Sequence, residues 1–192
     1  MFSKVVFIGL VWPEPETTAA GSRMLQLIQF FSDRSESLHF ASTALWTEYS
    51  YPLEEMGVMK HSIQLNDSSF DRWIKAIDPE IVVFDRFVIE EQFSWRVREN
   101  CPAALRLLDT EDLHFLRESR RLNLRDKKSY DDPEEYDDIT LRELASIYRS
   151  DLSLIISEEE MKLLTETYKV PADILHYLPF LISKDDLQEY PS

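Results

Sequence analysis

The chain has 192 residues, 44% of them hydrophobic and 30% charged, which is enough to bury the core of a single domain. Its three glycines, Gly9, Gly21 and Gly57, are scattered, which excludes the glycine-rich phosphate loops of dinucleotide-binding and P-loop proteins. A formal net charge of −15 would repel a polyanion, so we expect no nucleic-acid partner. The single cysteine, Cys101, excludes an internal disulfide and a multi-thiolate zinc site.

The first apolar run, Val5 to Val11, resembles the start of a signal peptide but is better explained as a buried strand. It is short, rich in β-branched residues and followed directly by Pro13-Glu14-Pro15-Glu16. No other stretch approaches the ~18 apolar residues that span a bilayer. We therefore expect a cytoplasmic protein.

Short apolar runs alternate with amphipathic segments along the chain, a pattern typical of βαβ units. The predicted strands are Val5 to Val11, Leu38 to Ala44, His61 to Leu65, Glu80 to Asp85, Ala104 to Asp109, Leu152 to Ser157 and Ile174 to Tyr177. The predicted helices are Thr17 to Ser32, Ser68 to Ile77, Ile139 to Ser150 and Glu158 to Tyr168. The pattern indicates a Rossmann-like, three-layer α/β/α fold with a mostly parallel sheet of about seven strands.

Two helix starts and one helix end have a chemical reason in the sequence. Asp67 or Ser68 can cap the second helix, and Ser157 can cap the helix that opens with three glutamates. Asp78 precedes a proline, which disfavours helical backbone and ends the second helix there.

In an open parallel sheet, ligands bind beyond the carboxyl ends of the strands, so the loops after the first, fourth and fifth strands are the candidate site. Gly21, Ser22 and Arg23 follow the first strand near a helix start, where free N–H groups favour an anion. The other candidates are Trp12, Asp85, Arg86, Asp109, Glu111, Asp112, His114 and Arg117. Carboxylates, an imidazole and a guanidinium this close together can transfer protons, bind hydroxyls and neutralise charge. No metal-ligand spacing is present, so we expect no metal.

Charges are segregated in the region after these candidates. Residues 117–128 hold six basic and two acidic side chains, and residues 131–138 then hold six acidic ones. The first interpretation is a solvated helix end followed by an acidic loop. The second is a basic face that meets an anionic ligand or membrane headgroups at the inner membrane.

Three segments, Val5 to Ile28, Asp78 to Phe87 and Leu108 to Arg117, resemble the N-terminal half of bacterial GT-B glycosyltransferases of the group 1 (family 4) type. The resemblance implies two Rossmann-like domains facing a cleft, with the acceptor bound mainly by the first and the nucleotide-sugar donor by the second. It implies that residues 1–182 are the acceptor-binding domain and that 183–192 lead toward an absent donor-binding domain. Such a fragment is expected to be inactive alone and to need no cofactor.

The resemblance also implies roles for individual residues. Gly21, with Ser22 and Arg23, would lie against the donor diphosphate, and a histidine after the fifth strand would contact the donor sugar. His114 is the candidate catalytic residue, although it comes about one helical turn later than the family pattern has it. The remaining candidates would bind a glycan or lipid-linked acceptor.

A non-enzymatic flavodoxin-like or receiver-like module is the alternative. In it, Asp85 and Asp109 would form an acidic ligand or signalling site. The first strand, however, lacks the acidic pair that receivers place at its end, because no acidic residue occurs before Glu14.

Overall fold

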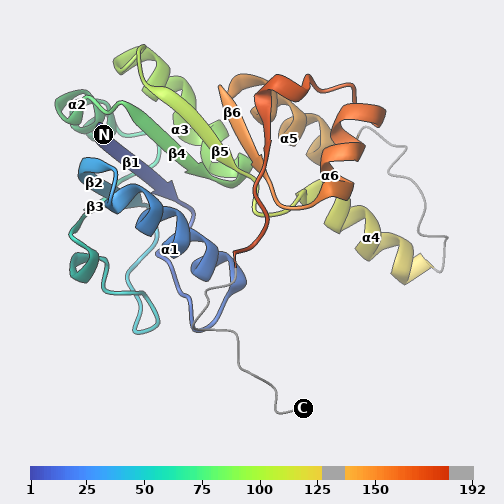
Figure 1. Ribbon diagram of the computed structural model, residues 1–192, viewed down its shortest axis with the longest axis horizontal. Helices are drawn as coiled ribbons and strands as arrows, with labels where there is room; N and C mark the ends of the chain where they lie inside the picture. Colours follow the sequence, from blue (N-terminus) through green and yellow to red (C-terminus); the bar gives the residue numbers. More distant parts are fainter. Residues whose placement is uncertain (127–136, 182–192) are drawn as a thin grey trace.

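The computed structural model describes residues 1–126, with the backbone alone for 122–126, and residues 137–181. Its centre is a seven-stranded sheet in the order β3-β2-β1-β4-β5-β6-β7, and every neighbouring pair of strands is parallel (Figure 1). The strands are β1 (Phe2–Gly9), β2 (Ser35–Ser42), β3 (Val58–Ser62), β4 (Ile81–Asp85), β5 (Leu105–Asp109), β6 (Leu152–Ile155) and β7 (Leu175–Tyr177). The predicted α/β Rossmann-like fold is confirmed.

The first three strands begin earlier in the chain than predicted. β1 starts at Phe2 and β2 at Ser35, each three residues before the apolar run that marked it, and β3 starts at Val58 rather than His61. Polar residues such as Ser37 pair in the ladder as well as apolar ones do. Since backbone hydrogen bonds define a strand and hydrophobicity marks only its buried part, the apolar pattern misplaced these boundaries.

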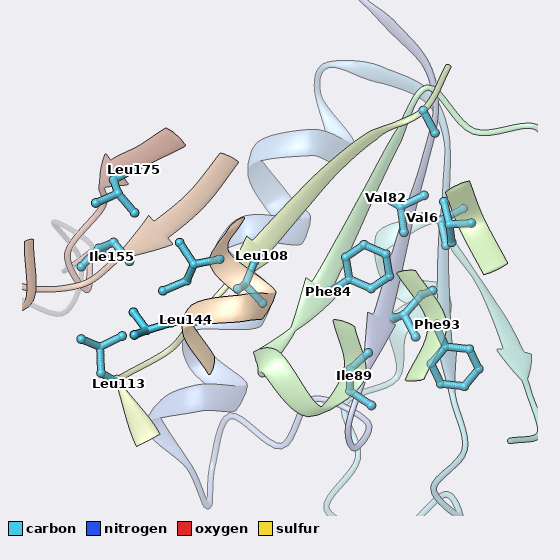
Figure 2. Close-up of a cluster of buried hydrophobic side chains, with 14 of the residues drawn as sticks. Val6, Val82, Phe84, Ile89, Phe93, Leu108, Leu113, Leu144, Ile155 and Leu175 are labelled. Carbon is cyan, nitrogen blue, oxygen red and sulfur yellow. The ribbon is translucent and has the colours of Figure 1, made fainter. Parts of the chain in front are cut away.

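The helices lie unevenly on the two faces of the sheet. They are α1 (Ala19–Ser32), α2 (Ser68–Ile77), α3 (Arg86–Asn100), α4 (His114–Asp126), α5 (Asp138–Arg149) and α6 (Glu158–Lys162). Side chains of α2, α3, α4, α5 and the α6 region fill one face, and Figure 2 shows this cluster extending from Phe93 and Phe84 at one end to Leu144 at the other. Among the described helices, α1 and the 3₁₀ turn Leu53–Met56 cover the other face.

The predicted helix caps are confirmed. Asp67 accepts a hydrogen bond from the Ser69 N–H at the start of α2, and Ser157 accepts one from the Glu160 N–H at the start of α6. Asp78 ends α2 in the left-handed conformation, at φ 51°, with its N–H donated to the Ile74 carbonyl. Local side-chain chemistry therefore decides these boundaries.

α3 has no distinct apolar stripe, and the sequence pattern did not separate it as a helix. Polar side chains are buried on it: Glu90 is fully buried and forms an ion pair at 2.6 Å with Arg149 of α5. Trp95, on the same helix, is 52% exposed. Part of the inward face of α3 is polar because it forms an ion pair with α5. A search for periodic apolar residues therefore does not detect this face.

Gly21 packs the first turn of α1 against the loop after β1. A Cβ atom at this position would lie 2.4 to 2.6 Å from the backbone C, O and N atoms of Glu14. Backbone atoms cannot move aside as the end of a flexible side chain can, so only glycine fits here.

We expect Gly21→Ala to lower the free energy of unfolding by about 1–3 kcal/mol through this steric conflict. Urea denaturation measures the change. Ala19→Ser, an exposed substitution on the same turn, is the control and should stay within about 0.5 kcal/mol of the wild type. Equal effects of the two substitutions would contradict the packing role.

Candidate functional site

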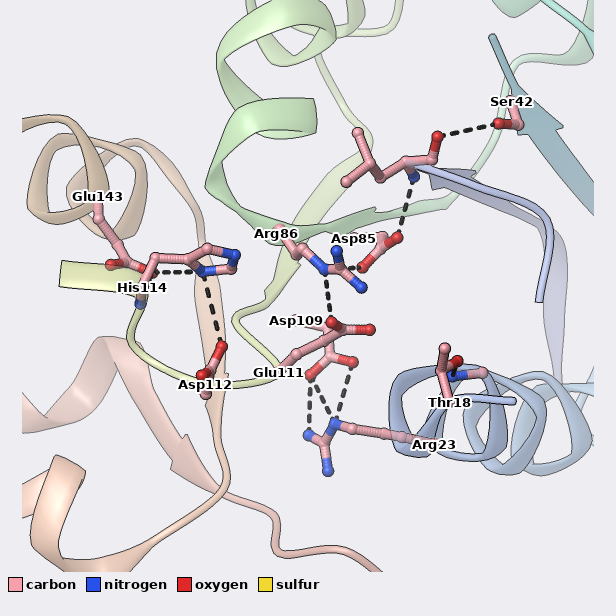
Figure 3. A network of polar contacts seen from close by, with 12 residues as sticks. Thr18, Arg23, Ser42, Asp85, Arg86, Asp109, Glu111, Asp112, His114 and Glu143 are labelled. Atoms are coloured by element: carbon pink, nitrogen blue, oxygen red, sulfur yellow. Dashed lines mark hydrogen bonds and ion pairs between the residues drawn. The ribbon is translucent and has the colours of Figure 1, made fainter. Parts of the chain in front are cut away.

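The carboxyl ends of β1, β4 and β5 lie side by side, because these strands are neighbours in the sheet. Asp85 ends β4 and is paired in register with Asp109, which ends β5. The Leu10 N–H, just after β1, donates to Asp85 Oδ2 at 2.9 Å. The three loops chosen from the sequence therefore meet at one edge of the sheet, as Figure 3 shows.

Arg23 and Asp109 form a buried ion pair at this edge. Arg23 Nε donates to both carboxylate oxygens of Asp109 at 2.9 and 3.1 Å, and Nη2 donates to Oδ1 at 2.8 Å. Nη1 of Arg23 donates to the carbonyls of Leu178 and Pro179. The Arg23 and Asp109 side chains are 2% and 0% exposed. The pair joins α1, β5 and the segment after β7.

Arg86 and Glu111 form a second, more accessible pair. Arg86 Nε lies 2.5 Å from Glu111 Oε2 and 3.3 Å from Asp85 Oδ1. Both residues adopt left-handed backbone conformations, with φ of 72° for Arg86 and 59° for Glu111. Such conformations cost about 1–3 kcal/mol each and cluster at ligand sites. No described residue accepts a hydrogen bond from the terminal nitrogens of Arg86, so they are available to a ligand.

The carboxyl groups around Arg86 have raised pKa values. Burial raises the pKa of Glu111 to about 7, and the nearby Asp85 carboxylate adds to the rise. Burial also raises the pKa of Asp85. Glu111 is therefore close to its titration midpoint at neutral pH and can act as a hydrogen-bond donor or acceptor there.

His114 begins α4 beside two buried glutamates. The His114 and Phe115 N–H groups donate to the Glu143 carboxylate at 3.1 and 3.0 Å, and the Leu113 N–H donates to Glu160 Oε1 at 3.1 Å. His114 Nδ1 lies 3.5 Å from Glu143 Oε1 and 3.7 Å from Asp112 Oδ1, and its ring meets Phe87 edge-on. The imidazole is held between carboxylates with little solvent contact.

Glu143 and Glu160 were not among the residues chosen from the sequence. Each is a glutamate on the inward face of a helix, α5 or α6, and each is buried. A buried glutamate needs a donor, and here the donors are free N–H groups at the start of α4. The signal in the sequence was an acidic residue within an apolar helix face.

Arg117 and Asp112 lie at the solvent side of the same region. Arg117 Nη1 donates to both carboxylate oxygens of Asp112, at 2.9 and 3.0 Å, and the arginine side chain is 60% exposed. Arg121, one turn along α4, pairs with Glu118. Arg120 is exposed as well, whereas the side chains of residues 122–128 and 131–136 lie outside the described part of the chain.

Three predicted donor-phosphate residues make internal contacts. The Gly21 N–H donates to Thr18 Oγ1 at 2.9 Å, and Ser22 Oγ donates to the Pro15 carbonyl at 3.1 Å. Arg23 is committed to Asp109, as described above. Because Gly21 has no side chain, the backbone of Glu14 can pack directly against it. From the sequence we had predicted a bound anion at this position instead.

Of the two tryptophans near strand ends, Trp46 is at the surface and Trp12 is not. Trp12 is 4% exposed, donates its Nε1–H to the Ala44 carbonyl and packs against Phe40. Trp46 covers Trp12 at a ring separation of 5.3 Å, and Lys60 Nζ lies 3.5 Å above the Trp46 ring. Burial removes Trp12 from the part of the site that a ligand can reach.

Carboxyl groups outnumber basic groups at this edge. Among the described residues, the carboxylic acids outnumber the guanidinium groups: Asp85, Asp109, Glu111, Asp112 and Glu143 stand against Arg23, Arg86 and Arg117. No group of three or more potential metal ligands occurs in the described part of the chain. The arrangement suits hydrogen bonding to neutral hydroxyls better than binding a diphosphate.

No family model and no curated protein sequence matches this chain. Solved structures do match its fold. The apo lipopolysaccharide outer core galactosyltransferase WaaB matches with a TM-score of 0.57 at 13% identity, over 94% of this chain and 47% of that one. Glycyrrhiza uralensis UGT73P12, complexed with glycyrrhetinic acid 3-O-monoglucuronide, matches with a TM-score of 0.53 at 11% identity, over 93% and 48%.

These likenesses show that the chain has a GT-B glycosyltransferase-like fold. The chain spans about half the length of the two glycosyltransferases that it matches.

Breaking the buried ion pair on one side should be much more damaging than removing both partners. We expect Arg23→Met alone to lower the free energy of unfolding by about 3–5 kcal/mol, because it leaves Asp109 buried without its counter-charge. Arg23→Met combined with Asp109→Leu should lose less than half as much. A double-mutant cycle by urea denaturation measures the coupling. Additive effects would show that the pair is not coupled.

The raised pKa of Glu111 makes stability depend on pH. Between the ordinary pKa of 4.5 and about 7, the unfolded chain ionises at Glu111 while the folded chain keeps the proton. The contribution of Glu111 to stability therefore falls as the pH rises through this window.

We expect Glu111→Gln to gain about 2 kcal/mol relative to the wild type between pH 5 and pH 7.5. Denaturation at both pH values measures this gain. In a carboxyl ¹³C titration, one signal with a midpoint near pH 7 should disappear in the variant. A wild-type chain with no carboxyl titrating between pH 6 and 8 would contradict the assignment.

Proposed function

We propose that this chain is the acceptor-binding half of a nucleotide-sugar-dependent glycosyltransferase. Residues 1–182 would be the N-terminal domain, and residues 183–192 would lead to a second domain that binds the donor. The observation that carries the proposal is the carboxylate-rich site at the ends of β4 and β5, in a domain with half of a GT-B-like fold. In parallel sheets, this edge is where ligands bind.

The charge of the site supports an acceptor rather than a nucleotide. A sugar offers several neutral hydroxyl groups, and these donate hydrogen bonds to carboxylates and accept them from guanidinium groups. Glu111, Asp112, Arg86 and Arg117 have the chemistry for this binding. Arg117 and Asp112 are open to solvent, with side chains 60% and 30% exposed, whereas Arg86 and Glu111 present only their edges, at 20% and 10%. The diphosphate of a donor would meet more carboxyl groups than guanidinium groups, and Arg23 is already paired with Asp109, so the donor would bind mainly through the second domain.

His114 is proposed as the group that accepts the proton of the attacking acceptor hydroxyl. The Glu143 carboxylate beside Nδ1 would stabilise the imidazolium formed in that step. In the transfer, the acceptor oxygen bonds to the anomeric carbon as the bond from that carbon to the donor phosphate breaks. The diphosphate would approach the first turn of α1, which requires the Glu14 loop to move from Gly21.

What the matched proteins act on or bind supports a sugar-bearing or lipid-linked acceptor. One is described as a lipopolysaccharide outer core galactosyltransferase, and the other was complexed with glycyrrhetinic acid 3-O-monoglucuronide. Hexosyl transfer by a bacterial, family 4 enzyme in the cytoplasm is our specific proposal. Among the described residues, no helix has the length and apolar character to cross a bilayer.

Burial argues against the receiver-like alternative. Asp85 and Asp109 are 4% and 0% exposed, and both accept hydrogen bonds from within the protein. A signalling carboxylate has to be reached by its reaction partner. The same burial argues against direct contact of Asp85 and Asp109 with an acceptor, which the sequence had led us to expect, and favours a supporting role.

A binding experiment with the chain alone tests the proposal. We expect no micromolar affinity for uridine or guanosine diphosphate sugars by calorimetry, because half of the proposed cleft belongs to another domain. Simple methyl glycosides should instead shift NMR signals of Glu111, Asp112 and His114 at millimolar concentration. Glu111→Gln should weaken this binding several-fold, whereas Glu166→Gln, an exposed control, should not. Micromolar nucleotide-sugar binding would overturn the domain assignment.

The basic face of α4 is proposed to contact an anionic acceptor or membrane surface. Arg120 and Arg121 are exposed, and each basic residue near an anionic membrane contributes about 1 kcal/mol. We expect co-sedimentation with vesicles to increase with anionic lipid content at low salt and to fall in Arg120→Glu/Arg121→Glu. Equal binding of variant and wild type would show that this face of α4 is solvated and does not contact the anionic surface.

A further inference from the structure

The terminal nitrogens of Arg86 are a part of the candidate site that has no partner within the described chain. Arg86 Nε lies 2.5 Å from Glu111 Oε2 and 3.3 Å from Asp85 Oδ1, and Figure 3 shows the guanidinium between these two carboxyl groups. No described residue accepts a hydrogen bond from Nη1 or Nη2. Neither nitrogen is among the buried side-chain atoms that lack a partner, so both reach solvent. One end of the guanidinium is therefore fixed and the other is open.

The surrounding protein holds this arginine in place. Its side chain is only 20% exposed, so most of its length packs against the protein. Its backbone has the left-handed conformation, at φ 72°, which a non-glycine residue adopts only at an energetic cost. Residues kept in such conformations cluster at ligand sites, and a side chain that is already fixed loses little conformational entropy on binding. The open end of Arg86 is therefore preorganised for a ligand.

Asp85 does not use its carboxyl group to cap α3. It precedes the first turn of this helix, yet its side chain makes no capping hydrogen bond. Its Oδ2 accepts from the Leu10 N–H, and its Oδ1, beside the Arg86 guanidinium, is buried without a hydrogen-bond partner. The positive end of the α3 dipole therefore has no side-chain cap from Asp85, which favours an anion beside Arg86.

The carboxyl groups beside Arg86 neutralise its charge only in part. Burial raises the pKa of Glu111 to about 7, and burial also raises the pKa of Asp85. At slightly acidic pH, Glu111 is therefore mostly protonated and no longer balances the guanidinium. Arg86 then offers a positive charge and two free N–H donors to an anionic group, while Asp85, at 4% exposure, stays out of its reach.

We propose that the terminal nitrogens of Arg86 bind a carboxylate of the acceptor, which makes the acceptor an acidic sugar. This inference rests on the proposed function and specifies the substrate class at the same edge. The terminal N–H groups of a guanidinium lie in one plane and match the two oxygens of a carboxylate, with one bond to each. A phosphate monoester has three terminal oxygens and up to two charges, for which one partly neutralised guanidinium supplies too few donors. A phosphorylated sugar is the competing ligand.

Two glycosides that differ in one group test the site on the chain itself. Methyl glucuronide carries a carboxylate where methyl glucoside carries a hydroxymethyl group, and at about pH 6 this carboxylate is ionised while Glu111 is below its pKa of about 7. The charge-assisted hydrogen bonds should make the glucuronide bind about tenfold more tightly. An NMR titration that follows the signals of Arg86 and Glu111 measures both dissociation constants. Equal affinities for the two glycosides would overturn the inference.

Arg86→Gln provides the matched variant, because it keeps a polar side chain and removes the guanidinium. The preference for the glucuronide should fall to within about twofold, whereas Arg98→Gln, the same change at an exposed position of α3, should retain it. Arg86→Lys keeps the charge without the planar pair of donors, should reduce the preference to about threefold, and serves if Arg86→Gln does not fold. A full preference in either Arg86 variant would overturn the inference.

The same titrations separate this inference from the general proposal. Equal binding of both glycosides at Glu111 would remove the carboxylate site and leave the acceptor proposal intact. No response to either glycoside would contradict the acceptor proposal and the inference together. A carboxylate preference combined with micromolar affinity for a nucleotide-sugar would support the Arg86 site and overturn the domain assignment. Glucose 6-phosphate that binds more tightly than methyl glucuronide would overturn the choice of a carboxylate.

Discussion

The ion pair between Arg23 and Asp109 is the interaction on which the candidate site depends. It joins the helix after the first strand to the end of the fifth, and its remaining donors hold the segment after β7. Two charges without solvent contact are stable only when each satisfies the other, and the three N–H···O contacts here do so. Because the pair lies at the junction of three elements, it fixes the position of the edge that carries Asp85, Glu111 and His114.

A second constraint is the concentration of carboxyl groups on that edge. Burial and mutual repulsion raise the pKa of Glu111 to about 7, and Arg86 approaches it from the neighbouring strand. The left-handed conformations of Arg86 and Glu111 turn the chain sharply where two strands end, at an energetic cost that the surrounding pairs offset. Such a site suits hydroxyl binding and proton exchange better than phosphate binding, which supports the proposed acceptor role.

The covering of the sheet is uneven. Side chains of α2, α3, α4, α5 and the α6 region cover one face, whereas among the described elements α1 and a short 3₁₀ turn cover part of the other. β5 and β6 therefore expose leucines beside α1, and together with the segment after β7 they line an open pocket. Arg23 lines this pocket and also holds Asp109 at the polar edge.

The sequence determined the fold class, because alternating apolar runs and caps such as Asp67 and Ser157 are local features that each segment carries by itself. It also placed Asp85, Asp109, Glu111 and His114 at one edge, since the ends of parallel strands meet there. Only the tertiary structure decided which groups remain available. Trp12 was expected at a ligand, but Trp46 covers it, and the guanidinium of Arg23 is taken by a carboxylate 86 residues away. Glu143 and Glu160 are part of the site for the same reason. A buried carboxylate needs hydrogen-bond donors, and their donors, the N–H groups at the start of α4, are distant in the sequence and come close only in the folded chain.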